Sequence, residues 1–295
     1  MRPKRCGRGA AFYVAAALAS SALAWAQQPL PMEPPHDSGQ SVTGAFEGWF
    51  PNPDGSFSLL LGYFNRNVKE ELDIPVGPNN RIEPGGPDQG QPTHFVAGRM
   101  WGSFVVQVPK DFGDKQLAWT LVANGKTTVI PLNLKADWEV SPFVDGIGNT
   151  PPYIAFAEAG PFVQGPVGQS TTVSAALDSP ITLTVWVADD ARLVPGMQHP
   201  KTPPITIGWT KFRGPGSVIF SNPRPAVEEQ DLRARPSNTA VSGKATTTAN
   251  FSEPGDYILR VVANDWTRDG GGGFQCCWTN AQVKVVVKAG AQGGR

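Results

Sequence analysis

The feature that most constrains this chain is a series of short runs of alternating apolar and polar residues, each ended by turn-forming residues. In ITLTVWVAD, residues 181–189, Ile181, Leu183 and Val185 occupy one face, which is the period of a strand. No segment shows the sustained 3.6-residue apolar period of a helix, and the 295 residues include 33 glycines and 29 prolines. The sequence therefore predicts an all-β protein with short strands and many turns.

Two hairpins are predicted by their turn residues. QLAWTLVANGKTTVIPL pairs two alternating runs across Asn124-Gly125, residues that readily take the positive φ of a type I′ turn. Asp54-Gly55 gives the same signal between the apolar runs TGAFEGWF and SFSLLLGYF.

The first 26 residues are typical of a secretory signal peptide. Four basic residues flank the start, an apolar stretch runs from Ala10 to Leu23, and Ala24-Trp25-Ala26 fits a small-x-small cleavage site. The alternative, a membrane anchor, needs about 20 apolar residues, and this stretch is shorter. We expect an exported protein, periplasmic, extracellular or on the cell surface, with no transmembrane segment after cleavage.

The charge balance argues against two classes of partner. The chain has 25 basic and 25 acidic residues, and the signal peptide holds four of the basic ones and no acid, so 21 basic residues face 25 acids after cleavage. A mildly acidic chain offers no electrostatic footprint for nucleic acid or for an anionic membrane surface.

Shifts in composition divide the chain into segments. We expect a signal peptide (1–26), a flexible leader (27–41), an N-terminal β domain (42–140), a Pro/Gly-rich linker (141–168), a second β domain (169–288) and a disordered tail (289–295).

The second domain contains seven strand-like runs, namely STTVSAAL, ITLTVWVAD, ITIGWTKF, SVIFSN, KATTTANF, DYILRVVAND and AQVKVVV. WTKFRGPGSVIFSNP, TTTANFSEPGDYILRVVANDW and AQVKVVV resemble the PKD-like immunoglobulin fold over residues 169–288. The resemblance implies a two-sheet sandwich, with Trp209 in a central strand filling the core and Tyr257 forming a tyrosine corner. Such domains mostly serve as spacers or binding modules.

The N-terminal half resembles a module of uncharacterised exported bacterial proteins, through EGWFPNPDGSFSLL, GYFNRN and IPVGPNNRIEPGGPDQGQPTHF. This resemblance implies a module and supplies no activity. Together the two halves predict two β-sandwich-type domains, the second immunoglobulin-like.

Residues 71–95 combine many prolines and glycines with little apolar alternation, which predicts an ordered surface loop. Aromatic faces and hydrogen-bonding groups in and near this loop suit a glycan or a protein partner. The candidate ligand-binding residues are Trp49, Tyr63, Phe64, Asn65, Arg66, Asn79, Asn80, Arg81 and His94. An equal alternative is that the asparagines serve turns.

Cys276 and Cys277 are the only cysteines left after signal cleavage. Neighbouring Cα atoms lie about 3.8 Å apart across a trans peptide, below the usual disulfide span, so a bond between them requires a distorted backbone. The pair is a disulfide candidate. Two free thiols, a bridge to another chain and soft-metal binding stay open as alternatives.

No catalytic residue, metal site or cofactor is predicted. The three histidines fall in separate regions, and no nucleophile-base pairing is found. We expect a non-enzymatic binding or scaffolding protein that engages its partner through the N-terminal module and the loop of residues 71–95. The alternative is a carbohydrate-active hydrolase with a carboxylate pair chosen from Glu47, Glu70, Glu71 and Glu83.

Overall fold

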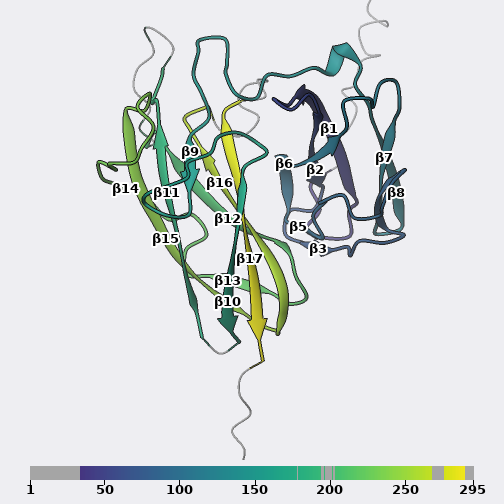
Figure 1. Ribbon diagram of the computed structural model, residues 1–295. Helices are drawn as coiled ribbons and strands as arrows, with labels where there is room; N and C mark the ends of the chain where they lie inside the picture. Colours follow the sequence, from purple (N-terminus) through teal and green to yellow (C-terminus); the bar gives the residue numbers. More distant parts are fainter. Residues whose placement is uncertain are drawn as a thin grey trace, which may run out of the picture. The chain divides into compact units, whose positions relative to one another are not determined.

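A computed structural model describes residues 34–177, 179–193, 196, 201, 203–267 and 276–289 (Figure 1). Within this part of the chain the only helical element is the 3-10 helix η2 (Ala136–Trp138), so the all-β prediction is confirmed there. The predicted signal peptide, the leader up to residue 33, the glycine run before Cys276 and the tail from residue 290 lie outside the described residues. No helix within the described ranges has the length and apolar character to cross a membrane.

The N-terminal half is built from eight strands in three small sheets. One sheet has the order β1-β2-β6, a second has the order β4-β7-β8, and β3 pairs with β5. The strands are β1 (Val42–Pro51), β2 (Phe57–Asn65), β3 (Leu72–Asp73), β4 (Asn80–Glu83), β5 (His94–Phe95), β6 (Gly98–Val108), β7 (Leu117–Ala123) and β8 (Lys126–Leu132).

Both predicted hairpins are confirmed. Ala123 of β7 pairs with Lys126 of β8, and Asn124 and Gly125 between them have φ values of 48° and 74°. Positive φ at both central positions is what a type I′ turn needs, and the Asn-Gly pair provides it at little cost. The turn at Asp54-Gly55 likewise joins β1 to β2, with Pro51 opposite Phe57.

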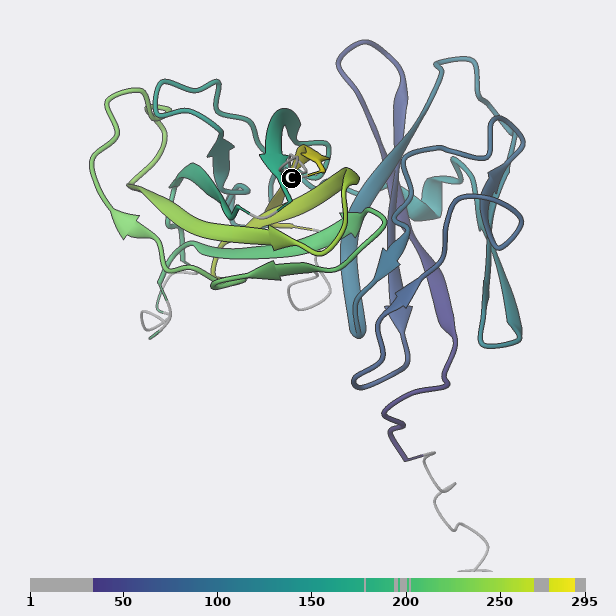
Figure 2. The same ribbon diagram turned by 90° about the horizontal axis from the view of Figure 1, so that it is seen from below.

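The C-terminal half is an immunoglobulin-like sandwich, as predicted (Figures 1 and 2). One sheet has the order β10-β17-β16-β12, and the other has the order β13-β15-β11-β9 with β14 also paired to β15. The first sheet closes through a parallel pairing of β10 with the last strand, β17. The strands are β9 (Tyr153–Ala155), β10 (Gln169–Ala176), β11 (Ile181–Asp189), β12 (Thr206–Arg213), β13 (Val218–Phe220), β14 (Glu228–Glu229), β15 (Val241–Phe251), β16 (Gly255–Asn264) and β17 (Trp278–Lys288).

All seven predicted strands of this sandwich are present, and their alternation points one face into the core. Leu183, Val185 and Val187 of β11 are buried together in that core. Trp209 is also buried there, with 2% of its surface exposed, but β12 is the edge strand of its sheet and not a central one. The tyrosine corner is confirmed, because the Tyr257 hydroxyl donates to the Glu253 carbonyl oxygen at 2.9 Å.

Two segments expected to be irregular are partly built into the fold. Residues 153–155, inside the expected linker, form β9 and pair with β11. At the end of the expected leader, the Gln40 N–H donates to the Asn67 side chain at 2.7 Å. Residues 36–295 group into one compact unit, and the domain boundaries proposed within it stay a prediction.

Candidate functional site

The loop of residues 71–95 is described throughout and contains β3, β4 and β5. Two buried asparagines hold it by bridging its ends. The Asn65 amide nitrogen donates to the carbonyl oxygens of Glu70 and Phe95 at 2.8 and 3.0 Å. The Asn80 amide nitrogen donates to those of Ile74 and Pro92 at 2.9 and 2.7 Å. Each amide therefore links two separate parts of the chain around the loop, and together the two amides hold the loop in one conformation.

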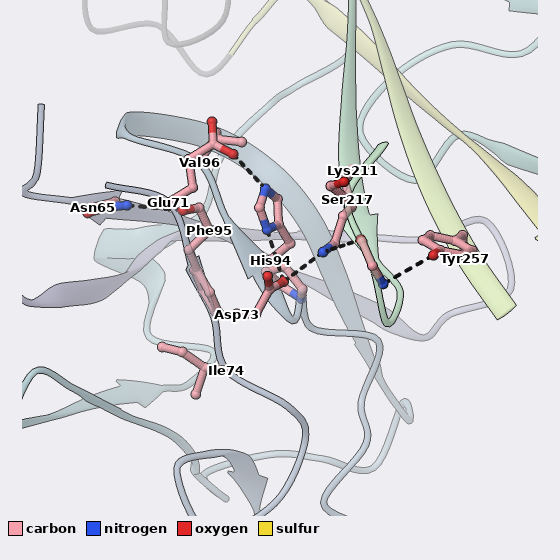
Figure 3. A network of polar contacts seen from close by, with 12 residues as sticks. Asn65, Glu71, Asp73, Ile74, His94, Phe95, Val96, Lys211, Ser217 and Tyr257 are labelled. Carbon is pink, nitrogen blue, oxygen red and sulfur yellow. Dashed lines mark hydrogen bonds and ion pairs between the residues drawn. The ribbon is translucent and has the colours of Figure 1, made fainter. Parts of the chain in front are cut away.

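A polar network runs from this loop into the immunoglobulin-like sandwich (Figure 3). Both ring nitrogens of His94 face carboxylate oxygens, Nε2 toward Glu71 and Nδ1 toward Asp73, each at 3.0 Å. Asp73 also lies 3.0 Å from the Lys211 ammonium of β12, which donates to the Gly216 carbonyl oxygen at 2.8 Å.

Further contacts fix the loop to β12. The Arg213 guanidinium donates to both carboxylate oxygens of Asp88 at 2.9 and 2.8 Å, and its Nε donates to the Gln91 carbonyl oxygen at 2.8 Å. The Thr93 N–H donates to the Phe212 carbonyl oxygen at 3.1 Å. The hydrogen bonds from Arg213 hold the pKa of Asp88 below its ordinary value. Part of the loop that we expected to contact an outside partner therefore contacts the chain's own immunoglobulin-like sandwich.

The nine predicted ligand-binding residues separate by burial. Tyr63, Asn65, Asn80 and His94 are buried, with 9% exposure at most. Their polar atoms serve internal contacts, such as the Tyr63 hydroxyl that accepts from the Val96 N–H at 3.0 Å. The members at the surface are Phe64, Arg66 and Asn79, which are exposed, and Trp49 and Arg81, which are half-buried.

Two of the surface members contact each other. The Arg66 guanidinium lies over the Phe64 ring, 5.1 Å from its centre. Of the others, the Trp49 indole N–H donates to the Lys135 carbonyl oxygen at 2.8 Å, and the Arg81 Nε donates to Glu83 at 2.8 Å. The structure therefore does not gather the nine residues into one surface, and their role toward a ligand stays a prediction.

The four carboxylates of the hydrolase alternative have separate partners. Glu47 is buried at a bulge in β1, where its carboxylate accepts from Arg99 at 2.5 Å and from the Gly102 N–H at 2.6 Å. Burial raises the pKa of Glu47, and the Arg99 charge and the Gly102 N–H oppose that shift.

The other three carboxylates lie nearer the surface. Glu71 contacts His94 and Glu83 contacts Arg81, while Glu70 accepts from the backbone N–H of Gly39 at 2.6 Å. No two of the four acids share a partner among the interactions described here, which is not the arrangement of two acids flanking one bond.

A groove of about 630 Å³ lies beside β12. Ile205, Ile207 and Trp209, which belong to the sandwich core, are among its lining residues, so both faces of this segment contribute to the groove. The groove is lined by Thr206, Gly208 and Thr210 of β12, by Arg260 of β16, by Arg224, and by Met100 of β6. Its volume lies within the range of about 300 to 1,000 Å³ typical of ligand sites.

The charged residues that line the groove are arginines, and no acid is among its described lining residues. Arg260 is buried, and its Nε donates to the Asn280 side-chain oxygen at 2.9 Å. The Asn280 amide in turn donates to the Gly102 carbonyl oxygen at 2.6 Å. One wall of the groove is therefore positioned by contacts between the two sandwiches.

Gly102 provides the close approach between the sandwiches. Its φ is +43°, and a Cβ atom built on it would lie 2.1 Å from the Trp278 ring. Glycine takes this positive φ without strain and, because it has no Cβ atom, leaves room for the indole.

Comparisons with known proteins add little beyond these observations. No protein-family model and no curated protein matches the chain. Among solved structures, the D00-D0 domain of intimin is 11% identical, with a TM-score of 0.25 over 83% of this chain and 100% of that chain. Domains 4 and 5 of the S-layer protein SbsC are 12% identical, with a TM-score of 0.21 over 84% of this chain and 98% of that chain. The N-terminal periplasmic domain of ScsB from Proteus mirabilis is 10% identical, with a TM-score of 0.23 over 82% of this chain and 92% of that chain.

Cys276 and Cys277 are joined by a disulfide, and both residues are buried. The Cys277 N–H donates to the Thr267 hydroxyl at 3.0 Å, so the pair is held against the segment that follows β16. Among the described residues, His, Cys, Asp and Glu side chains form no group of three that could hold a metal ion.

Sequence reasoning missed the groove, because its lining comes from strands far apart in the chain. One signal was present in the sequence. Arg260 interrupts the apolar run DYILRVVAND, and a charged residue inside a strand of that kind requires a partner or a functional role.

Proposed function

We propose that this chain is an exported, non-enzymatic binding protein with a scaffold role. The loop of residues 71–95 fastens the N-terminal β module to the immunoglobulin-like sandwich, and the ligand occupies the groove beside β12. The observation that carries this proposal is the groove itself, which combines ligand-sized volume with an all-basic set of charged lining residues.

The ligand chemistry follows from the lining. Arg224 is an exposed cation on the groove, which favours an anionic group such as a carboxylate. The buried side-chain oxygen of Asn264, which also lines the groove, has no hydrogen-bond donor within the described structure. A hydroxyl near the carboxylate would supply that donor. A glycan that contains uronic acids has both groups.

The PKD-like resemblance of residues 169–288 supports the same role, because such domains mostly act as spacers or binding modules. The predicted signal peptide supports export.

The test is a binding experiment on the mature protein, using uronic-acid oligosaccharides, neutral oligosaccharides of equal length and acidic peptides. We expect the uronic-acid oligosaccharides to bind. Thr206→Trp, which fills the groove from an exposed position, should weaken that binding at least about tenfold, the equivalent of about 1.4 kcal/mol. Thr182→Trp is the matched control, since Thr182 is exposed on a strand of the other sheet.

If both tryptophan variants bind the oligosaccharides equally well, the groove is not the binding site. Binding of acidic peptides alone would overturn the glycan assignment. If the groove is correct, Arg224→Gln should also reduce the salt dependence of binding, because an exposed charge pair is screened by salt.

A further inference from the structure

One end of the immunoglobulin-like sandwich gathers buried polar groups from three distant segments. Asp189 ends β11, Asp265 follows β16, and Asn149 precedes β9. Their exposed fractions are 1%, 4% and 1%. The Asn149 amide nitrogen donates to Asp265 Oδ2 at 2.6 Å. Next to them, the N–H and hydroxyl of Thr150 donate to Asp190 Oδ2 at 3.1 and 3.0 Å, so the segments around residues 149 and 189 are in direct contact.

Two oxygens in this cluster lack a donor. Asp189 Oδ2 accepts from the Ala191 N–H at 2.7 Å, but Asp189 Oδ1 is buried without a hydrogen-bond partner in the described structure. Asn149 Oδ1 is likewise buried without a hydrogen-bond partner in the described structure. Since the Asn149 nitrogen is the atom that faces Asp265, the Asn149 side-chain oxygen is the atom left unpaired. Buried acceptors of this kind are rare, and each calls for a missing partner.

The surroundings are predominantly acidic. Asp190 accepts from Thr150 and from the Arg192 N–H, and Asp145 accepts from the Asn149 N–H at 2.9 Å. The Arg192 guanidinium donates to the Gly148 carbonyl oxygen at 2.7 Å. Burial raises the pKa of Asp189 to about 8, and the charges of Asp265 and Asp190 add to that shift.

We propose that a calcium ion binds at this end of the sandwich, with Asp189 Oδ1 and Asn149 Oδ1 as ligands. Asp265 supplies a second negative charge beside them. Calcium takes six to eight oxygen ligands, including carboxylates, amide oxygens, backbone carbonyls and water. Such a set does not need three converging acidic side chains, so it agrees with the lack of a group of three among the described His, Cys, Asp and Glu residues.

The disulfide supports the position of this site. Cys277 Sγ lies 3.6 Å from the Asn149 carbonyl oxygen. Thr267, whose hydroxyl accepts from the Cys277 N–H, donates that hydroxyl to Asp265 Oδ1 at 2.6 Å. The linked cysteines thus pack directly behind the residues proposed to hold the cation, and they fix the start of β17 there. Outer groups of this kind orient the ligands of metal sites.

Two other partners would satisfy the unpaired oxygens. A proton on Asp189 would turn its carboxyl group into a donor, or buried water molecules would donate to the two oxygens. The experiment therefore compares the mature protein in EDTA with the same protein in millimolar CaCl2, with NaCl added to equal ionic strength. Calorimetric titration of the parent with CaCl2 gives the stoichiometry without any variant.

We expect one calcium ion per chain and a rise in Tm of about 5 °C at saturating calcium. Asp189→Asn, which keeps the shape and removes the charge, should abolish both the bound ion and the rise. Asp256→Asn, an exposed acid on β16, is the charge control and should keep both. The proposal is overturned if the parent binds no calcium, or if Asp189→Asn responds to calcium as the parent does.

Discussion

At the scale of single residues, buried polar side chains determine how the irregular segments are held. Asn65 and Asn80 are fully buried, and each uses one amide to bind two backbone carbonyls from opposite ends of the loop. The Asn80 side-chain oxygen also accepts from the Trp119 indole N–H at 3.0 Å. A side chain so fully used is costly to truncate, because its partners would be left buried and unpaired.

Asp189 leads to a prediction about pH. Its pKa is raised from an ordinary value of 3.8 to about 8, so the folded protein keeps a proton that the unfolded chain releases. Without calcium, the free energy of unfolding should therefore fall as pH rises from about 4 to about 8, by up to about 1.4 kcal/mol per pH unit from this group. Asp189→Asn removes that contribution.

Urea denaturation of both proteins in EDTA at several pH values measures this effect. The stability of Asp189→Asn relative to the parent should increase steadily across that interval and level off above about pH 8. Parallel pH profiles for the two proteins would show that Asp189 is already ionised in the fold. Calcium should flatten the parent profile, since it favours the ionised carboxylate.

At the scale of elements, predictions succeeded where the signal is local and failed where pairing is distant. The hairpin of β7 and β8 is encoded by Asn124-Gly125 itself. By contrast, β9 has three residues inside a Pro/Gly-rich segment and exists because it pairs with β11. Asn80 is buried beside Trp119, which is 39 residues away in the sequence and donates its indole N–H to the Asn80 side chain. The residues next to Asn80 in the sequence do not indicate this contact, so we predicted a surface position.

The strength of the contact between the loop of residues 71–95 and β12 can be measured through the ion pair of Asp88 and Arg213. Asp88→Ala and Arg213→Ala each remove a bidentate ion pair whose arginine side chain is 18% exposed. A double-mutant cycle in urea should show a coupling energy of about 1 kcal/mol, at the upper end for such pairs. Amide exchange in residues 86–92 should accelerate in both variants.

The control cycle uses Arg81 and Glu83, which pair within the N-terminal half. It should show weaker coupling and leave exchange in residues 86–92 unchanged. Additive effects of Asp88→Ala and Arg213→Ala would mean that the pair does not hold the loop.

At the scale of the whole molecule, the two sandwiches share apolar surface. Phe50 and Leu60 of the N-terminal half form one buried cluster with Val262 and Trp278 of the C-terminal half. Phe212 of β12 is buried in the N-terminal core. Contacts of this kind couple the folding of the two sandwiches, so residues 36–295 should unfold as one cooperative unit although they contain two cores.

Trp278→Ala tests this coupling. The indole is 1% exposed, packs on Gly102 and donates to its carbonyl oxygen at 3.4 Å, so its removal leaves a cavity between the sandwiches. We expect a loss of about 3 to 5 kcal/mol and a calorimetric trace that changes from one transition to two. Trp138→Ala is the control, because that indole is 47% exposed and should cost far less. Two transitions already present in the parent would show that the sandwiches fold independently, and a single transition in Trp278→Ala at lower Tm would place the coupling in the polar contacts of the loop with β12.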